Sequence, residues 1–384
     1  MTLHRLWEHE ARTPVWRQGG QVVVAGHALV RRVLGDQTAF APDNALDAVT
    51  PIPVAALRVL SRNGFRLPAT LANNGSDTHP ALRAIVGEAM SPARVDALRP
   101  WLTGVVRRRV ARLARELREG GAVDLYETLA ADLPLLALAR LIAMPEQDVA
   151  VVKRFSRAAL ELFWAPLDTE RQTALANVVG EHHAQLRELA RTAPGGLIAE
   201  LREHCGPGGE DQVVAALFFL LVAGQETTSQ FLTLLLHRLA GEPDVRDGLA
   251  SGRHTVADVV EEGLRLVPPI VSWRRVAAVD TELDGFAVRA GESVLLWLGA
   301  AGREAAGDDY VPGRRGSRRH LAFGAGAHRC LGAQLARMES AVVVAEAAPL
   351  LRGCEVVKAP DCPDNLSFRM PDALVVTKSR TAPR

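Results

Sequence analysis

A single cysteine follows a glycine-rich run in the segment FGAGAHRCLG at residues 323–332. A cysteine at the first turn of a helix meets unpaired N–H groups and the positive end of the helix dipole, and both favour the thiolate. A thiolate binds metal ions or attacks electrophiles. Gly324, Gly326 and Gly332 allow sharp bends and a close approach to a flat group. We therefore interpret Cys330 as a reactive thiolate, against the alternative of a small core residue beside a turn.

The pattern around this cysteine is specific enough to indicate a family. The cysteine loop of the cytochrome P450 superfamily, the haem-thiolate monooxygenases, is similar to Phe323-Gly-x-Gly-x-His328-x-Cys330-x-Gly332 followed by Ala336-Arg337-x-Glu339. The resemblance implies a mainly α fold with a small β region, a long central helix over the haem, and the cysteine loop on the proximal side. It also implies haem b as the cofactor, Cys330 as the axial ligand of its iron, and Phe323 and Gly324 as haem contacts.

A second motif lies inside a strongly apolar segment. Its residues, Ala223-Gly224-Gln225-Glu226-Thr227-Thr228, resemble the oxygen-binding stretch of the same family. Ala223 and Gly224 leave room for a ligand against the helix backbone, and the Thr227 hydroxyl can bond the carbonyl four residues earlier. A carboxylate in apolar surroundings is costly unless it has a role, and Glu226 can relay protons. The resemblance implies that Glu226 and Thr227 deliver protons to the distal oxygen.

An acid and an arginine are spaced by three residues at Glu262 and Arg265. On a helix they lie one turn apart on the same face, where they can pair. With Val-Pro-Pro following at 267–269, they are similar to the family's Glu-x-x-Arg motif, which implies a structural role in holding the cysteine loop. The arginine that completes this network is left open among Arg314, Arg315 and Arg318.

Haem carries two propionates, which require cations or hydrogen-bond donors. His79 and Arg83 match the family's His-x-x-x-Arg at the start of its third helix. Arg275 matches the strand arginine, with Arg274 as an adjacent rival, and His328 is the histidine of the cysteine loop. The resemblance implies that these residues bind the propionates.

The resemblance covers about residues 30–375 and departs from the family in two places. The chain has Ala301-Gly-Arg303-Glu-Ala-Ala-Gly-Asp-Asp-Tyr310 where the family usually has an Asn-Arg-Asp-Pro stretch and a phenylalanine-containing loop, so this region should pack differently. His79 follows Gly-Ser-Asp-Thr and precedes Pro80, which makes the entrance to that helix unusual.

The elements that position these motifs are mostly helical. Apolar residues have helical spacing in three long segments: 81–118 with a break at Ser91-Pro92, 125–164 and 169–203. A further helix begins at Glu210 and runs to Gly241, a length of about 45 Å at 1.5 Å per residue. After residue 270 the pattern alternates and is punctuated by Asp284-Gly285, which predicts short strands and hairpins. Residues 302–319 predict a loop and 331–351 a helix.

Composition excludes several classes of protein. The 45 Lys and Arg residues nearly balance the 44 Asp and Glu residues. The chain therefore has no overall positive charge that would attract nucleic acid or an anionic membrane. The four cysteines show no zinc-site or disulfide spacing, which favours a reducing, cytoplasmic compartment. The N-terminus lacks a signal-peptide pattern, and the apolar stretch 213–224 is too short to span a bilayer. We expect one domain over residues 1–384, a monomer, and no membrane.

The resemblance implies a monooxygenase that activates O₂ and hydroxylates or epoxidises a small molecule. Three largely apolar segments are expected to line its pocket: 45–57, Phe219 to Ala223, and Ile270 to Trp273. Such walls suit an apolar or aromatic molecule of moderate size. By analogy with bacterial enzymes of this layout, we expect the tailoring of a secondary metabolite.

Electrons must come from separate proteins, since the chain has no flavin or iron–sulfur pattern; a ferredoxin and its reductase are implied. The predicted basic docking face consists of Arg107, Arg108, Arg109, Arg112, Arg115, Arg329 and Arg337. Three alternative functions stay open: oxidative coupling of aromatic rings in a peptide or cyclic dipeptide, a catalytically silent recruitment module, and a thiol hydrolase using Cys330 with His328. The last lacks an orienting third residue.

Overall fold

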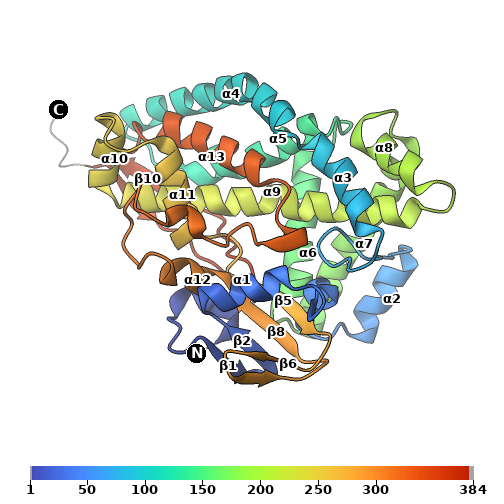
Figure 1. The fold of residues 1–384 in the computed structure, drawn as a ribbon. Helices are drawn as coiled ribbons and strands as arrows, with labels where there is room; N and C mark the ends of the chain where they lie inside the picture. The colour runs from blue at the N-terminus through green and yellow to red at the C-terminus, as the bar shows by residue number, and fades with distance from the viewer. Residues whose placement is uncertain (1, 380–384) are drawn as a thin grey trace.

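The computed structural model describes residues 2–379, so the first residue and the last five of the predicted domain lie outside the described part. Helices make up most of the chain, and the larger sheet gathers on one side of them (Figure 1). This confirms the mainly α fold with a small β region. The α-helices are α1 (His27–Gly35), α2 (Val54–Arg62), α3 (His79–Ala89), α4 (Pro92–Arg118), α5 (Leu133–Leu141), α6 (Val149–Trp164), α7 (Thr169–Thr192), α8 (Gly196–Cys205), α9 (Glu210–Ala240), α10 (Pro243–Ala250), α11 (Val256–Leu266), α12 (Leu298–Glu304) and α13 (Ala333–Ala347).

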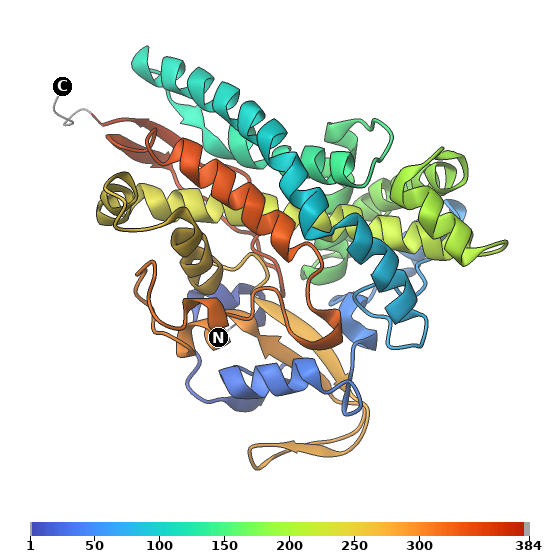
Figure 2. The same cartoon turned by 45° about the horizontal axis from the view of Figure 1, so that its top comes forward.

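The central element is α9, whose predicted extent is confirmed. Glu210 and Asp211 occupy its first turn, where the helix dipole favours carboxylates, and Gly241 and Pro243 end it. It crosses the molecule with α4 and α13 on one side and the larger sheet on the other (Figures 1 and 2). A helix this apolar needs cover on all sides.

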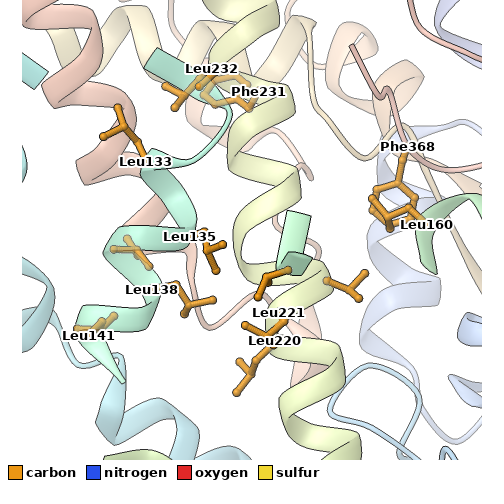
Figure 3. Packing of buried hydrophobic residues seen from close by; sticks show 14 of the residues in the cluster. Leu133, Leu135, Leu138, Leu141, Leu160, Leu220, Leu221, Phe231, Leu232 and Phe368 are labelled. Atoms are coloured by element: carbon orange, nitrogen blue, oxygen red, sulfur yellow. The ribbon is translucent and has the colours of Figure 1, made fainter. Parts of the chain in front are cut away.

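The neighbours of α9 supply that cover. Leu135 and Leu138 of α5 lie beside α9 near Leu220 and Leu221 (Figure 3), and all four side chains are buried. Each such burial contributes about 1.5–3 kcal/mol. By length and composition α9 could span a membrane, which the shorter stretch 213–224 did not suggest, but 72% of its apolar window is buried inside the protein. It is therefore packed as a core helix.

Two predicted helical segments are broken in the structure. The segment 125–164 divides into a five-residue π-helical turn (Tyr126–Ala130), α5 and α6. The segment 169–203 divides into α7 and α8 at Gly196, whose φ of 67° no other residue adopts easily. A Cβ at Gly196 would also lie 2.6 Å from the Ile142 carbonyl oxygen, so tight packing between the segments imposes the break. The predicted break at Ser91-Pro92 is confirmed, since α3 ends at Ala89 and α4 begins at Pro92.

In the described part of the chain the strands form three sheets, and the largest has the order β1-β2-β8-β5-β3. Their bounds are β1 (Val15–Gln18), β2 (Gln21–Val24), β3 (Phe40–Ala41), β4 (Val123–Asp124), β5 (Ser272–Ala277), β6 (Thr281–Leu283), β7 (Phe286–Val288), β8 (Ser293–Trp297), β9 (Cys354–Lys358) and β10 (Val375–Lys378). The predicted hairpin turn at Asp284-Gly285 joins β6 to β7, and both residues have positive φ. In the large sheet β5 pairs antiparallel with β8, and Arg275 of β5 lies opposite Val294 of β8.

Candidate functional site

A cavity lies between α9 and the cysteine loop (residues 323–332). Ala223, Gly224 and Thr227 form its α9 wall, and Cys330 lines it from the loop. The other predicted site residues that line it are Arg83, Arg275, Phe323, Gly324 and His328. The tertiary structure thus brings together residues that are more than 200 positions apart in the sequence.

The conformation of the cysteine loop depends on glycine. Gly324 and Gly326 have φ of 65° and 72°, and a Cβ at Gly326 would lie 2.4 Å from the Leu34 carbonyl oxygen. The Cys330 N–H donates to the Phe323 carbonyl at 2.9 Å, which closes the loop. The helix α13 begins at Ala333, so Cys330 precedes the helix rather than occupying its first turn as predicted.

Cys330 lines the cavity and is exposed there. Burial raises its pKa, while the backbone N–H of Gly332 and the guanidinium groups of Arg83, Arg329 and Arg337 act in the opposite direction. Burial outweighs these groups, so the free Cys330 is a thiol and not the thiolate that the sequence predicted, and binding a metal would require it to lose its proton.

The alternation of β5 places Arg275, and not Arg274, at the cavity. Arg275 lines the cavity and is 1% exposed, whereas Arg274 donates to the carbonyl groups of Ala45 and Asp47. Within residues 2–379 no carboxylate pairs with Arg275; its side chain donates only to the Arg274 carbonyl. Burial lowers the pKa of Arg275 to about 10, and a cation in such a place needs an anion.

Two histidines lie beside this cation. The rings of His79 and His328 stack with centroids 4.2 Å apart, and the His328 Nε2 contacts the Asn74 carbonyl at 3.0 Å. Burial lowers the pKa of both, that of His328 to about 4, so both rings are neutral at pH 7. The second nitrogen of each ring is buried with no partner among the described residues. Arg275 and the His328 nitrogen, both on residues that line the cavity, fit the carboxylates of a haem. The His79 ring itself does not line the cavity.

Arg83 has a different partner from the one expected. It lines the cavity, but its guanidinium donates to the Arg329 carbonyl of the cysteine loop. It therefore ties α3 to that loop, and only its remaining N–H groups are left for a propionate.

The unusual entrance to α3 is a turn in which Asn74, Ser76 and Thr78 hydrogen-bond to one another.

The two functional residues of α9 point in different directions. The Thr227 hydroxyl donates to the Ala223 carbonyl at 2.7 Å, as predicted. Glu226 is fully buried, does not line the cavity, and pairs with Lys153 and, at 3.8 Å, with Arg157 of α6. Burial lowers the pKa of Lys153. Glu226 thus lies behind Thr227 in a charged cluster that joins α9 to α6.

Glu262 and Arg265 form a fully buried, two-point ion pair on α11, with N–O distances of 2.9 and 2.8 Å. Of the three candidate arginines, Arg314 approaches Glu262, at 3.7 Å, while Arg315 and Arg318 are exposed. The pair holds residues 302–311 by donating to the carbonyls of Gly302, Gly307 and Asp309 and accepting from the Val311 N–H. The Glu262–Arg265 pair therefore contacts this segment directly, and the segment leads on to the cysteine loop.

Comparison with known proteins agrees with this geometry. The family model described as "Cytochrome P450" matches residues 169–381. Cytochrome P450-SOY of Streptomyces griseus is 32% identical over 85% of this chain and 76% of that protein. This chain belongs to the cytochrome P450 family. The cytochrome P450 monooxygenase PikC of Streptomyces venezuelae is likewise 32% identical, over 88% of this chain and 79% of PikC.

Solved structures agree as well. Cytochrome P450 CREJ in complex with (4-ethylphenyl) dihydrogen phosphate superposes with a TM-score of 0.90 and 28% identity, covering 98% of this chain and 96% of CREJ. Membership of the family makes this protein a haem enzyme and a monooxygenase that acts on small molecules.

The distal wall of this cytochrome P450 is aromatic. Trp164 at the end of α6 stacks on Trp273 of β5 with centroids 6.2 Å apart, and Phe368 meets Trp164 edge-on at 5.0 Å. All three line the cavity together with Phe219, Val222 and Ile270. The predicted stretches around 219–223 and 270–273 thus contribute, but the predicted stretch 45–57 does not line the cavity, whereas Leu71 and Ala72 do.

The predicted basic face of this cytochrome P450 is smaller than expected. Arg107 pairs with Glu346 at 2.9 Å, Arg109 with Asp132, and Arg112 with Glu116 at 3.5 Å. Arg337 is bound to a buried acid, Glu261. Arg108, Arg115 and Arg329 are the exposed members of the set that pair with no acid within residues 2–379.

Two residues near the site, Lys153 and Glu261, escape the sequence motifs, and a third, Glu339, belongs to the cysteine-loop motif but was given no role. Lys153, the partner of Glu226, lies 73 positions earlier on another helix, and nothing in its own segment distinguishes it. Glu261 stands next to Glu262, and this doubling of the acid was the available signal. Glu339 is 2% exposed on α13, and burial raises its pKa well above the ordinary value.

Proposed function

We propose that this cytochrome P450 inserts one oxygen atom of O₂ into an apolar or aromatic small molecule, by hydroxylation or epoxidation. One observation carries the proposal: the thiol of Cys330 and the hydroxyl-bearing Thr227 line one cavity that also has aromatic walls. The whole activity is proposed for one domain and one chain.

The proposed cofactor is haem b, held by the residues of this cavity. Cys330 would bind the iron. Arg83, Arg275 and His328, which line the cavity, would bind the propionates together with His79, which stacks on His328. Arg275 supports this assignment because it is a buried cation without an acid partner among the described residues. When bound, haem supplies the redox chemistry of O₂ activation, to which a thiolate ligand contributes electron density.

The proposed role of Glu226 and Thr227 is proton supply. The Thr227 hydroxyl donates a hydrogen bond to the Ala223 carbonyl. The Thr227 oxygen is therefore available to accept a hydrogen bond from a group in the cavity. Glu226 comes one residue earlier and is held by Lys153 and Arg157 away from the cavity. A proton taken up at this charged cluster has a short path along α9 to Thr227.

The proposed substrate carries an aromatic ring or a rigid apolar skeleton. Trp164, Trp273 and Phe368 offer ring faces and edges to such a molecule. CREJ, whose structure resembles this one, was solved with an aryl phosphate. A secondary metabolite that the enzyme tailors fits this description.

The proposed electron donor is a ferredoxin with its reductase. Arg108, Arg115 and Arg329 are exposed and available to acidic side chains of such a partner. We propose further that the enzyme acts as a monomer in the cytoplasm and binds neither nucleic acid nor membrane.

The first test of this proposal is spectroscopic. Haem-loaded protein should give the thiolate-type band when its ferrous form binds carbon monoxide, and Cys330→Ala should abolish that band. The matched control is Cys205→Ala, because Cys205 is a half-buried thiol that does not line the cavity. Retention of the band in Cys330→Ala would refute the ligand assignment.

The second test concerns the substrate. Aromatic amino acids, cyclic dipeptides, terpenoids and polyketides are titrated into the ferric protein, and a shift from low to high spin identifies the class that reaches the iron. Product analysis with that class then decides the reaction, since a monooxygenase product contains one new oxygen atom and a coupled product contains none. Exclusive formation of coupled rings would replace our proposal with the coupling alternative.

A further inference from the structure

A buried carboxylate joins three elements next to the cysteine loop. Glu261 lies on α11, beside the Glu262 that pairs with Arg265, but it makes a separate set of contacts. Its Oε2 meets the His320 Nε2 at 3.1 Å, and its two oxygens accept from the Arg337 Nε and Nη2 at 2.5 and 3.2 Å. We call Glu261, His320 and Arg337 the clamp.

The contacts of the clamp define the tautomer of its histidine. The His320 Nδ1 accepts from the backbone N–H of Ala322 at 3.2 Å, so it carries no proton. The proton is then on Nε2, which donates to Glu261. Through this ring the carboxylate of α11 positions the backbone immediately before Phe323.

The arginine of the clamp reaches the same loop from the other side. The Arg337 guanidinium lies over the Phe323 ring, 4.5 Å from its centroid, and the Phe323 carbonyl accepts the Cys330 N–H at 2.9 Å. The two arms of the clamp therefore end at adjacent residues, Ala322 and Phe323, and Phe323 closes the loop on Cys330.

The clamp also pairs two opposite charges, of which Arg337 lies against the cysteine loop. Burial alone would raise the pKa of Glu261, but the hydrogen bonds from His320 and Arg337 outweigh burial and lower it to about 2, so the group is a carboxylate at pH 7. The Arg337 guanidinium lies on Phe323, whose carbonyl accepts the Cys330 N–H, so its positive charge is held against the loop that carries the sulfur. Glu261 thus partly neutralises a positive charge that the sulfur feels.

We propose that Glu261 is a positioning residue that holds the Arg337 charge at a fixed place near Cys330, and that this balance of charges sets the reduction potential of the haem iron. The inference rests on the proposed function, because it requires haem bound through Cys330. It assigns Arg337 to the tuning of the iron and removes it from the docking face for the electron donor.

The test is the reduction potential of haem-loaded variants, measured by spectroelectrochemical titration without a partner protein. Glu261→Gln removes a negative charge, which favours the reduced iron, so the potential should move to a more positive value. Arg337→Gln removes a positive charge and should move the potential to a more negative value. The second shift should be the larger, because Arg337 contacts Phe323 of the loop directly, whereas Glu261 contacts His320 and Arg337. The double variant should return toward the wild-type potential.

The direction of the shifts separates tuning from simple support. If the clamp only stiffened the loop, both single variants would loosen it in the same way and shift the potential in the same direction, which would overturn the proposal. Arg337→Lys retains the charge and should lie closer to wild type than Arg337→Gln. Glu346→Gln is the matched control, since Glu346 lies nine residues further along α13 and also pairs with an arginine, and its potential should equal that of wild type.

Failure of the inference and failure of the proposed function are distinguishable. If the wild-type protein shows no thiolate band with carbon monoxide, the proposed function fails and the clamp has no iron to tune. If wild type and both variants show the band but their potentials agree, only the inference is wrong. Should Glu261→Gln fail to retain haem, the effect of the Arg337 charge is still tested. Arg337→Gln should lower the reduction potential, and Arg337→Lys should leave it closer to the wild-type value.

Discussion

The ammonium group of Lys153 on α6 meets the fully buried carboxylate of Glu226 on α9, and this ion pair lies behind Thr227. It joins the helix that lines the cavity to the helix that ends in the aromatic wall at Trp164. Lys153 also donates to the side chain of Gln225 at 3.1 Å. Glu226, the acid of the oxygen-binding motif, is therefore bound in an ion pair and does not lie on the cavity surface.

Lys153→Met should reduce both stability and coupling. Removing one partner of a buried ion pair leaves an uncompensated charge and costs about 3–5 kcal/mol, with the lower value expected because Arg157 stays nearby. The product formed per electron pair should fall several-fold as proton supply to Thr227 slows. Urea unfolding and product-to-NADH ratios measure the two effects. Unchanged coupling would show that this lysine has no part in proton supply.

Thr227→Ala should separate electron consumption from product formation. The alanine removes the hydroxyl that bonds the Ala223 carbonyl and faces the cavity, so peroxide should be released while NADH is still consumed. Thr227→Ser retains the hydroxyl and serves as the control, with coupling close to that of wild type. If Thr227→Ala formed as much product per NADH as wild type, another group would deliver the protons.

Glu262→Ala should yield little folded, haem-loaded protein. Both partners of the Glu262–Arg265 pair are fully buried, and loss of the acid leaves an unpaired guanidinium at a cost of about 3–5 kcal/mol. A suitable control is Glu242→Ala, which removes the acid of the partly exposed Arg238–Glu242 pair and should cost about 1 kcal/mol or less. Equal losses in the two variants, measured by denaturant unfolding, would contradict the structural role of Glu262.

The stability of the protein should fall in mild acid because of His182. This side chain is 3% exposed on α7 and stacks on Phe155, and burial lowers its pKa from 6.5 to about 4. Since the unfolded chain binds the proton first, the free energy of unfolding should decrease as the pH falls from about 6.5 to about 4. His182 alone should account for about 3 kcal/mol of this decrease.

His182→Phe retains a stacking ring without a titrating group, so its stability should depend less on pH over the same range. Urea unfolding of both proteins at pH 7 and pH 4.5 measures the difference. Parallel curves for the two proteins would show that His182 does not titrate in this interval.

The sequence by itself determined the elements and motifs whose signals are local. The extent of α9 follows from its acidic start, its apolar run and its Gly241 end, and all of these lie within one segment. The hydrogen bond of Thr227 to Ala223 and the pairing of Glu262 with Arg265 follow from helical spacing. The cysteine loop follows from glycines that take up positive φ.

Only the tertiary structure decided which partner each buried polar group finds. The alternation of β5 in a packed sheet sends Arg275 into the cavity and Arg274 to the carbonyls of Ala45 and Asp47. Lys153 reaches Glu226 because α6 packs on α9, and Arg314 approaches Glu262 because residues 302–311 fold over α11. A buried charge must be compensated, but the compensating group is chosen by proximity in space, and a single sequence does not contain that information.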